Sequence, residues 1–322
     1  MTYALLVGCG SAVATALLGA PFVAWLRARK LGKAISDEGP QSHLSKEGTP
    51  TMGGLLIMAV WLGAAFVAGV PKDRDVLLPV AVGALFAVIG TYDDLGTLVG
   101  RGKRDAHDRM LMVAKVLAFA VVGVVSAWLL YDRIDAPRLL VPHYGAYDIG
   151  PVYVLVAIGL IVALTSGVGV TDGLDMLLSS TGALAFSAFG AIALVQRDTA
   201  LATICFAMVG ALLGFLYWNA YPARVFMGDS GSLPLGGILS LVALMSGWWL
   251  LVPVIGVVFV LNILADVLQI GSFRLTGRRV LRMAPLHHHF EQIGWNEVTV
   301  TARFAALGAI GAIAGVALAA LR

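Results

Sequence analysis

Five aspartates lie in three polar segments of an otherwise apolar chain. They are Asp93 and Asp94 in YDDLG, Asp172 and Asp175 in TDGLD, and Asp229 in FMGDSGSL. Mg²⁺ prefers oxygen ligands, and proteins usually hold it with one or two carboxylates together with substrate phosphates. Dispersed aspartates therefore indicate Mg²⁺ and a phosphorylated substrate rather than zinc.

Each acidic pair also has a structural explanation. We expect Asp93 and Asp94 to end a helix, where two acids oppose the helix dipole. A cation or a function must offset them, unless the helix end is simply solvated. Thr171 or Asp172 would cap the helix that we expect to follow. A cap does not require Asp175, which the spacing of three residues places on the same face of a helical turn.

The glycine-rich segment from Gly228 to Ser232 contains Asp229 and precedes an expected helix. Backbone N–H groups at such a helix N-terminus suit a phosphate, although glycine-rich turns without a ligand are commonplace. The segment lacks the lysine of a Walker loop. Together with Asn219, ten residues upstream, it indicates a site for a metal and a phosphate.

Three consecutive histidines, His287, His288 and His289, make up half of the histidines in the chain. They are internal, which argues against a purification tag. Three side chains in a row point in different directions, so they are poorly spaced to converge on one zinc ion. We expect a loop here, either without a function or with imidazoles that hydrogen-bond phosphate oxygens or move protons.

Basic residues accompany these segments, and each of them either binds phosphate or sets the topology of the chain. For any single one, topology or contact with lipid headgroups is the simpler explanation. These residues are Lys46, Arg101, Lys103, Arg104, Arg109 and Arg282.

The elements that must position these side chains are membrane helices. Of the 322 residues, 59% are hydrophobic and 13% are charged, whereas a soluble domain averages about 25% charged residues. The two cysteines lie inside apolar runs and predict neither a disulfide framework nor a metal site. The N-terminus lacks the basic start of a signal peptide, so its apolar run is expected to be a retained helix. We predict an all-α, polytopic integral membrane protein with a single domain over residues 1–322.

Ten apolar runs are candidates to cross the hydrocarbon core, which is about 30 Å thick. Each run is continuously apolar rather than alternating, and lipid offers no partner to backbone groups, so we expect helices. The boundary near Gly247 is the least marked. The runs are Leu5–Leu26, Gly53–Val70, Val76–Tyr92, Met110–Tyr131, Val152–Ser166, Leu177–Val195, Ala200–Trp218, Leu233–Gly247, Trp249–Leu268 and Val300–Leu321.

The distribution of charge predicts the orientation of this bundle. The odd-numbered loops carry 14 of the 22 Lys and Arg residues, the other loops and the termini carry 6, and Lys115 and Arg303 lie inside helices. The positive-inside rule places the odd-numbered loops in the cytoplasm and both termini outside. The acidic and histidine segments all lie in these cytoplasmic loops. The residues alone therefore predict a Mg²⁺-dependent enzyme that acts on a phosphorylated, lipid-linked substrate at the membrane surface.

The motifs resemble, in their order, those of the polyprenyl-phosphate N-acetylhexosamine-1-phosphate transferases. They are GPQSHLSKEGTPTMGG, YDDLG, TDGLD, NAYPARVFMGDSGSLPLGG and LRMAPLHHHFEQIGW, and they span nearly the full chain. The histidine and VFMGDSGSL segments most resemble the branch that transfers phospho-N-acetylmuramoyl-pentapeptide.

The resemblance implies a reaction at the bacterial inner membrane. Undecaprenyl phosphate attacks the sugar-bearing β-phosphate of UDP-N-acetylmuramoyl-pentapeptide, UMP leaves, and lipid I of peptidoglycan synthesis forms. The chemistry needs a cation, here Mg²⁺, to neutralise the diphosphate. The expected partners are these two substrates and membrane lipid, with no nucleic acid, and a homodimer stays open.

Roles for individual residues follow from the resemblance. Asp229 matches the family's Mg²⁺ ligand, and Asp93 and Asp94 match a catalytic pair that helps to place the metal and the lipid, with Asp93 the candidate for engaging the lipid phosphate. The histidine triplet, His287–His289, matches essential histidines near the diphosphate. Positions expected to contact substrate are Lys46, Arg109, Asp172, Asp175, Asn219, Phe226 and Gly228, with Phe226 stacking on uracil.

The chain also departs from the family pattern. Gly169 replaces an asparagine of the expected nucleotide pocket, Arg109 aligns with a family lysine, and Asn262 replaces an acid, while Asp266 has no evident role. Three alternatives therefore stay open: a sister transferase that uses another UDP-N-acetylhexosamine, an inactive paralogue, and a transporter. Transporters often show internal repeats and midplane polar sites, and neither is evident in this sequence.

Overall fold

The computed structural model describes residues 1–29, 31–32, 46, 48–70, 76–99, 106–132 and 138–321. Within these ranges, nothing is described for the side chains of residues 99, 106–112, 114 and 138. The basic residues Arg101, Lys103 and Arg104 therefore lie outside the described residues.

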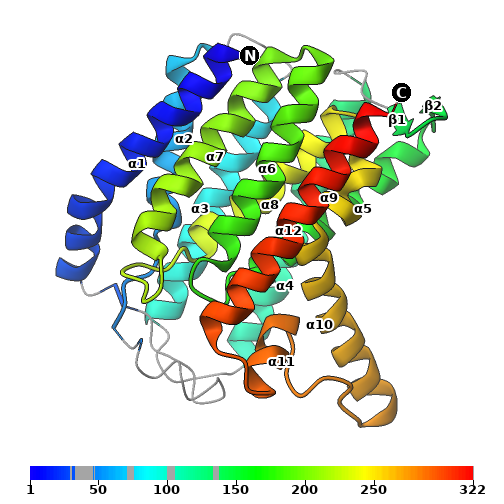
Figure 1. Cartoon of the computed structure of the whole chain (residues 1–322). Helices are drawn as coiled ribbons and strands as arrows, with labels where there is room; N and C mark the ends of the chain where they lie inside the picture. Colours follow the sequence, from blue (N-terminus) through cyan, green and yellow to red (C-terminus); the bar gives the residue numbers. More distant parts are fainter. Residues whose placement is uncertain are drawn as a thin grey trace.

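Helices at the ten predicted positions form the body of the molecule (Figure 1). Of the described helices, eight are long and apolar enough to cross a membrane, and α2 and α8 are shorter apolar helices at the other two positions. The prediction of an all-α, polytopic membrane protein is confirmed. The bounds are α1 Thr2–Ala28, α2 Gly54–Val67, α3 Leu77–Val99, α4 Ala106–Asp132, α5 Val152–Thr171, α6 Leu177–Gln196, α7 Thr199–Asn219, α8 Asp229–Met245, α10 Val257–Thr276 and α12 Glu297–Ala320.

The boundary near Gly247 is real but more complex than predicted. After α8, the chain forms a 3-10 turn, η3 (Trp249–Leu251), and a short helix, α9 (Val252–Ile255), before α10 begins at Val257. The predicted ninth run, Trp249–Leu268, is therefore broken at Gly256. The proline in the first turn of α9 suits the start of that helix. Gly256 then ends α9 and precedes α10, so one apolar run holds two helices.

Two further elements were not predicted. The segment after α4 forms an antiparallel hairpin of β1 (Arg138–Val141) and β2 (Gly145–Asp148). The histidines do not lie in a loop, because Leu286–Gln292 form the short helix α11. The helix begins after Pro285, whose extended backbone precedes the first turn. Periodicity could not reveal α11, because seven residues are too short to show a clear apolar face.

Glycines let the helices approach one another closely, as is typical of packing within a membrane. A Cβ atom at Gly210 of α7 would lie 1.9 Å from the carbonyl oxygen of Gly8 in α1. A Cβ atom at Gly90 of α3 would lie 1.9 Å from the carbonyl oxygen of Asp229, the first residue of α8. This contact brings the start of α8 beside the segment of α3 that carries the acidic pair.

Helix α8 lies at the centre of the bundle, and all its residues from Ser230 to Leu244 are buried. The two termini of the chain lie at the same end of the molecule, and α11 lies at the other end, beside α10 and α12 (Figure 1). The predicted arrangement of the termini on one face is therefore compatible with the fold.

Candidate active site

The Asp93 and Asp229 carboxylates converge on one cation, the Lys115 ammonium. Lys115 Nζ lies 3.0 Å from Asp93 Oδ2 and also contacts Asp229 Oδ2. The three side chains come from α3, α4 and α8, and they retain 31%, 23% and 26% of their exposure, in that order. The two carboxylates also lie close enough to interact with each other, so the ammonium screens a repulsion between like charges.

Asp94 has a different environment from its neighbour. It is 7% exposed, and its two oxygens each accept a hydrogen bond of 3.0 Å, from the backbone N–H groups of Asp229 and Ser230. A carboxylate at a helix N-terminus is stabilised by the helix dipole and by N–H groups that lack partners in the helix. Asp94 therefore anchors α8 to α3 and fixes Asp229 beside Asp93.

The expectation that the acidic pair ends a helix is wrong, because α3 continues to Val99. The pair does not stop the helix, since the Asp94 side chain binds backbone groups of α8 rather than its own backbone. Thr97 Oγ1 donates to the carbonyl oxygen of Asp94 at 2.8 Å and satisfies a group in the last turns.

The glycine-rich segment forms the first turn of α8, with Gly228 immediately before the helix at a φ of 74°. This left-handed backbone strongly favours glycine. A Cβ atom there would also lie 2.6 Å from Asp94 Oδ2 and 2.9 Å from Thr51 Oγ1. The N–H group of Gly228 donates to Asp172 Oδ2 at 2.9 Å, so the second acidic segment is tied to the first.

Asp172 and Asp175 lie in an irregular turn between α5 and α6 rather than on a helical face, so their side chains take separate partners. The capping prediction is also wrong: α5 ends at Thr171, and α6 begins at Leu177 with no side-chain cap at Met176. The two aspartates instead form hydrogen bonds with residues that are distant in the sequence, so neither caps the helix.

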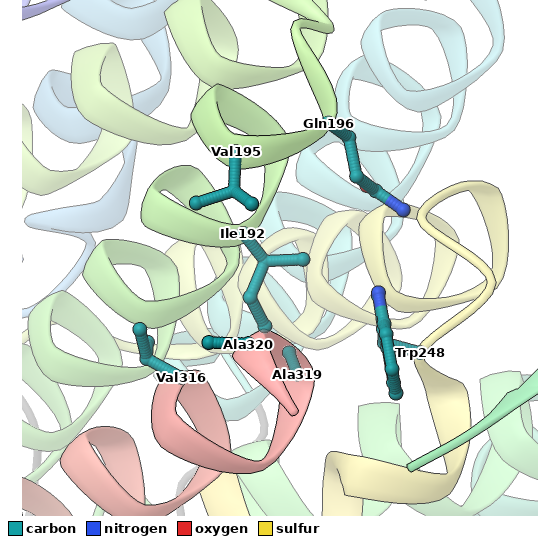
Figure 2. A pocket seen from close by; sticks show the side chains of 7 residues that line it. All are labelled: Ile192, Val195, Gln196, Trp248, Val316, Ala319 and Ala320. Atoms are coloured by element: carbon teal, nitrogen blue, oxygen red, sulfur yellow. The ribbon is translucent and has the colours of Figure 1, made fainter. Parts of the chain in front are cut away.

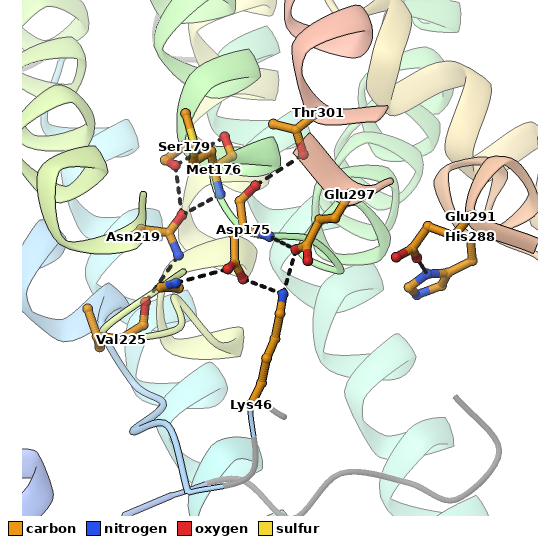
Figure 3. A network of polar contacts seen from close by, with 11 residues as sticks. Lys46, Asp175, Met176, Ser179, Asn219, Val225, His288, Glu291, Glu297 and Thr301 are labelled. Atoms are coloured by element: carbon orange, nitrogen blue, oxygen red, sulfur yellow. Dashed lines mark hydrogen bonds and ion pairs between the residues drawn. The ribbon is translucent and has the colours of Figure 1, made fainter. Parts of the chain in front are cut away.

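Asp175 belongs to a second network, which Figure 3 shows together with Lys46 and Glu297. Lys46 Nζ lies 2.7 Å from Asp175 Oδ1 and 2.5 Å from Glu297 Oε1. Glu297 Oε1 also accepts from the backbone N–H of Asp175 at 2.7 Å. Lys46 Nζ lies 5.9 Å from the centre of the Phe226 ring and 5.8 Å from that of Tyr221. An aromatic face, an ammonium and two carboxylates thus meet at one place.

Asn219 joins two of the segments that form this network. Its Oδ1 accepts from Met176 N and Ser179 Oγ, both at 3.0 Å, and its Nδ2 donates to the carbonyl oxygen of Val225 at 3.1 Å. The amide is 5% exposed, so in this structure it joins the turn before α6 to the segment that carries Phe226. Its predicted contact with substrate stays a prediction.

The three histidines have three different sets of partners, as the spacing predicted. His287 is fully buried, and its Nδ1 lies 3.3 Å from Asn262 Oδ1. His288 Nδ1 lies 2.7 Å from Glu291 Oε2 (Figure 3). His289 Nδ1 accepts from the backbone N–H of Arg282 at 3.2 Å.

Gly173 connects the histidine helix to the acidic segments. A Cβ atom at this position would lie 2.2 Å from His287 Nε2, so only a glycine allows the ring to lie against this turn. Because Asp172 binds the Gly228 N–H, the histidines, the second acidic segment and the start of α8 form one continuous polar region.

Sequence reasoning missed two residues of this region. The sequence pattern shows Lys115 only as a charge inside a helix, and it does not mark Glu297. A lone lysine in an apolar helix is itself a signal, because ionisable residues at membrane depth are costly and usually functional. For Glu297 there was no comparable signal, since an acid in the first turn of a helix is common. Arg109 lies in α4, and its side chain is not among those described.

The carboxylates of Asp93 and Asp229 form a set of ligands that suits Mg²⁺. Among the described residues, no group of three or more His, Cys, Asp or Glu side chains is placed to hold a metal ion by itself. Asp93 and Asp229 nevertheless already share one cation. Two carboxylates that leave positions for water and substrate phosphates match the way Mg²⁺ is usually bound.

A separate pocket lies near the end of the molecule that holds the two termini. Figure 2 shows its lining at the ends of α6 and α12 and beside Trp248. Among the described residues, the polar side-chain groups that line it are the Gln196 amide and the Trp248 indole N–H, and no titratable group does. It is therefore not a candidate for the chemistry described above.

The bundle and its carboxylate-rich end belong to a known class of membrane transferases. Residues 76–247, more than half of the chain, match the family model of glycosyl transferase family 4. Within that class, residues 46–58 match signature 1 of the phospho-N-acetylmuramoyl-pentapeptide-transferases.

Curated proteins of that name are similar over nearly the whole chain. The protein from Chloroflexus aurantiacus is 41% identical, and the match covers 99% of this chain and 90% of the relative. The Rubrobacter xylanophilus protein is 42% identical, with 92% and 91% covered, and the Geobacillus thermodenitrificans protein is 38% identical, with 94% and 93% covered. The chain belongs to the phospho-N-acetylmuramoyl-pentapeptide-transferase family.

Proposed function

We propose that this protein transfers phospho-N-acetylmuramoyl-pentapeptide from its UDP-linked donor to undecaprenyl phosphate in a Mg²⁺-dependent reaction. The products are UMP and lipid I. The observation that carries the proposal is the convergence of Asp93 and Asp229 on one cation at the N-terminus of α8. The family relatives support the choice of substrates.

The uridine part of the donor is assigned to the Lys46–Asp175–Glu297 network. Phe226 supplies an aromatic face for the base. Lys46 donates hydrogen bonds and Asp175 accepts them, so together they can recognise a ring that carries both carbonyl oxygens and an N–H group. Lys46 must exchange part of its present contacts with the two carboxylates for contacts with the donor.

The diphosphate is assigned to the start of α8 and the residues around it. Gly228 and the first turn of α8 present backbone N–H groups at the positive end of the helix dipole. Lys115 and the imidazoles of α11 can donate to phosphate oxygens, and Asp93 and Asp229 would hold Mg²⁺. When bound, Mg²⁺ neutralises the diphosphate and stabilises the charge on the leaving phosphate.

The reaction is one displacement at the phosphorus that carries the sugar. An oxygen of the lipid phosphate forms a bond to this β-phosphorus, and the bond from the β-phosphorus to the bridging oxygen breaks. UMP leaves with that oxygen. A phosphate monoester is largely ionised near pH 7, with a second pKa of about 6, so a strong base is not required. Asp93 repels an anionic lipid phosphate unless a cation lies between them, so we assign it the placement of that cation beside the nucleophile.

We propose that the polar region faces the cytoplasm and that both termini lie outside. The excess of Lys and Arg in the odd-numbered loops supports this orientation. Cysteines introduced at Thr2 and at Arg278 would test it, because only the former should react with a membrane-impermeant thiol reagent added to intact cells. The native Cys9 is exposed in α1 and would be replaced by serine first.

The function is tested by incubating the purified protein with undecaprenyl phosphate and UDP-N-acetylmuramoyl-pentapeptide, with Mg²⁺ or with EDTA. We expect lipid I and an equal amount of UMP only when Mg²⁺ is present. UDP-N-acetylglucosamine is the competing donor. Product from this donor and none from the muramoyl-pentapeptide nucleotide would show that the protein is a sister transferase. No UMP from either donor would refute the assignment as a transferase of this class.

A further inference from the structure

One face of α10 carries three polar side chains within the apolar part of the helix that precedes Gly271. Asn262, Asp266 and Gln269 are four and three residues apart, so they lie in one row along the helix. Helix α10 packs against α11, the helix that carries the histidines. A polar row in a membrane helix is costly unless each member has a partner, so the row needs an explanation.

The two outer members of the row hold the histidine segment in place. Asn262 is fully buried and lies between Thr171 Oγ1, at 3.0 Å from its Nδ2, and the His287 ring. Gln269 Oε1 accepts from the backbone N–H groups of Val280 and Leu281, at 3.1 and 2.9 Å. Both residues therefore fix the chain on either side of the place where α11 begins.

Asp266, the middle member, lies between Asn262, which contacts His287, and Gln269, which binds the segment before α11. This position on the face of α10 that packs against α11 brings its charge near that of His288. The carboxylate is half-buried, so a neighbouring cation is needed to offset its cost in an apolar helix. His288 already contacts a second carboxylate, because its Nδ1 lies 2.7 Å from Glu291 Oε2, whose side chain is 6% exposed. The imidazole thus has one acid on its own helix and another on α10.

The two acids have different effects on the ring. A carboxylate only accepts hydrogen bonds, so the contact with Glu291 places a proton on Nδ1 of His288. Nε2 is then the ring nitrogen left to contact a substrate. In the ring form that donates from Nε2 to a phosphate oxygen, a second carboxylate offsets the added positive charge.

We propose that Asp266 is a positioning residue of the transfer reaction, which acts through His288 to hold this imidazole ready to donate to the substrate diphosphate. The inference rests on the proposed function. It also gives a role to the acid that the sequence left unexplained.

The test compares Asp266→Asn and Asp266→Glu with wild type by UMP release at saturating lipid, with both UDP-linked donors. Asp266→Asn should lower kcat by about 10- to 100-fold, the usual effect of losing a partner that orients a functional imidazole. KM for the donor should change little if Asp266 acts only through His288, and Asp266→Glu should recover most of kcat. Asp148→Asn is the matched control, since Asp148 lies on the exposed strand β2 and bonds only the nearby Gly150 N–H in the described contacts.

A double-mutant cycle with His288→Gln decides whether Asp266 acts through the imidazole. Adding Asp266→Asn to His288→Gln should have no further effect on kcat, whereas independent residues would give multiplied losses. Thermal unfolding midpoints are measured on wild type, both single variants and the double variant. The changes in midpoint for the two single variants should not add up to the change for the double variant, and this test works even where turnover of His288→Gln is below detection.

Three results would overturn the inference. They are wild-type kcat in Asp266→Asn, a loss that Asp266→Glu does not recover, and independent effects of the two substitutions in both measurements. If wild type turned over only UDP-N-acetylglucosamine, the proposed substrate would be refuted. The comparison of the Asp266 variants with wild type would stay valid with that donor.

Discussion

Lys115 is the group whose removal tests the site most directly. Lys115→Met keeps the length of the side chain and removes the charge that Asp93 and Asp229 share. A hydrogen bond to a charged group contributes about 1.5–3 kcal/mol. The three side chains keep 23% to 31% of their exposure, so solvent screens both contacts. We expect the free energy of unfolding without Mg²⁺ to fall by about 1–3 kcal/mol, part of it from repulsion between the two carboxylates.

The response of the variant to Mg²⁺ distinguishes this explanation from a general loss of stability. A divalent cation can take the place of the ammonium between the carboxylates, so Mg²⁺ should raise the unfolding temperature of Lys115→Met more than that of wild type. Turnover should still fall by about 100- to 1,000-fold, because a donor to the developing charge is lost. Thermal unfolding followed by tryptophan fluorescence, with and without Mg²⁺, measures the first effect, and UMP release measures the second.

Arg274→Met is the control, because it removes a cation from the exposed end of α10 and should change stability by less than about 0.5–1 kcal/mol. The reasoning fails if Lys115→Met unfolds at the wild-type temperature in Mg²⁺-free buffer and gains no more than wild type from Mg²⁺. That result would mean that the ammonium does not hold the two acids together.

Four further substitutions test other parts of the site. Asp229→Asn should lower Mg²⁺-dependent lipid I formation by at least about 100-fold, and near-normal activity would remove the residue from the metal site. Gly173→Ala should lower the unfolding temperature and the yield of folded protein, because its Cβ would lie 2.2 Å from His287 Nε2; wild-type stability would contradict this close packing. Glu297→Gln should weaken binding of the UDP-linked donor by about tenfold, or 1.4 kcal/mol, measured by calorimetry, since it removes the charge of an acceptor that serves two hydrogen bonds. Gly169→Asn should tighten donor binding, because its Cβ would meet only ordinary contacts at 3.5 Å or more, and an unchanged affinity would place this position outside the pocket.

The helices could be predicted because their signal is local. A run of apolar residues long enough to cross the hydrocarbon is visible in any window of the chain, and helices stand at all ten predicted positions. The exceptions have local causes as well. A proline in an apolar run marks the start of α9, Gly256 separates α9 from α10, and α11 is too short for a periodic pattern.

Residue type predicted some of the site residues, but it did not predict the partners of each one. Residue type marked Asp93 and Asp229, because acids in a membrane protein need a compensating cation or a function. Residue type could not show that Asp94, although adjacent to Asp93, instead binds the N–H groups at the start of α8. Adjacent side chains on a helix point about 100° apart, so their environments depend on which helices surround them.

The sequence by itself determined that the chain crosses a membrane many times, and it predicted that the acids and histidines gather on one side. Both conclusions rest on composition and on counting spans. Only the tertiary structure decided which charges meet: Lys115 reaches Asp229 across 114 residues of sequence, and Lys46 reaches Glu297 across 251. The physical reason is that hydropathy sums over neighbours in the chain, whereas an ion pair depends on contact between helices, here set by glycines such as Gly90 that let α3 and α8 touch.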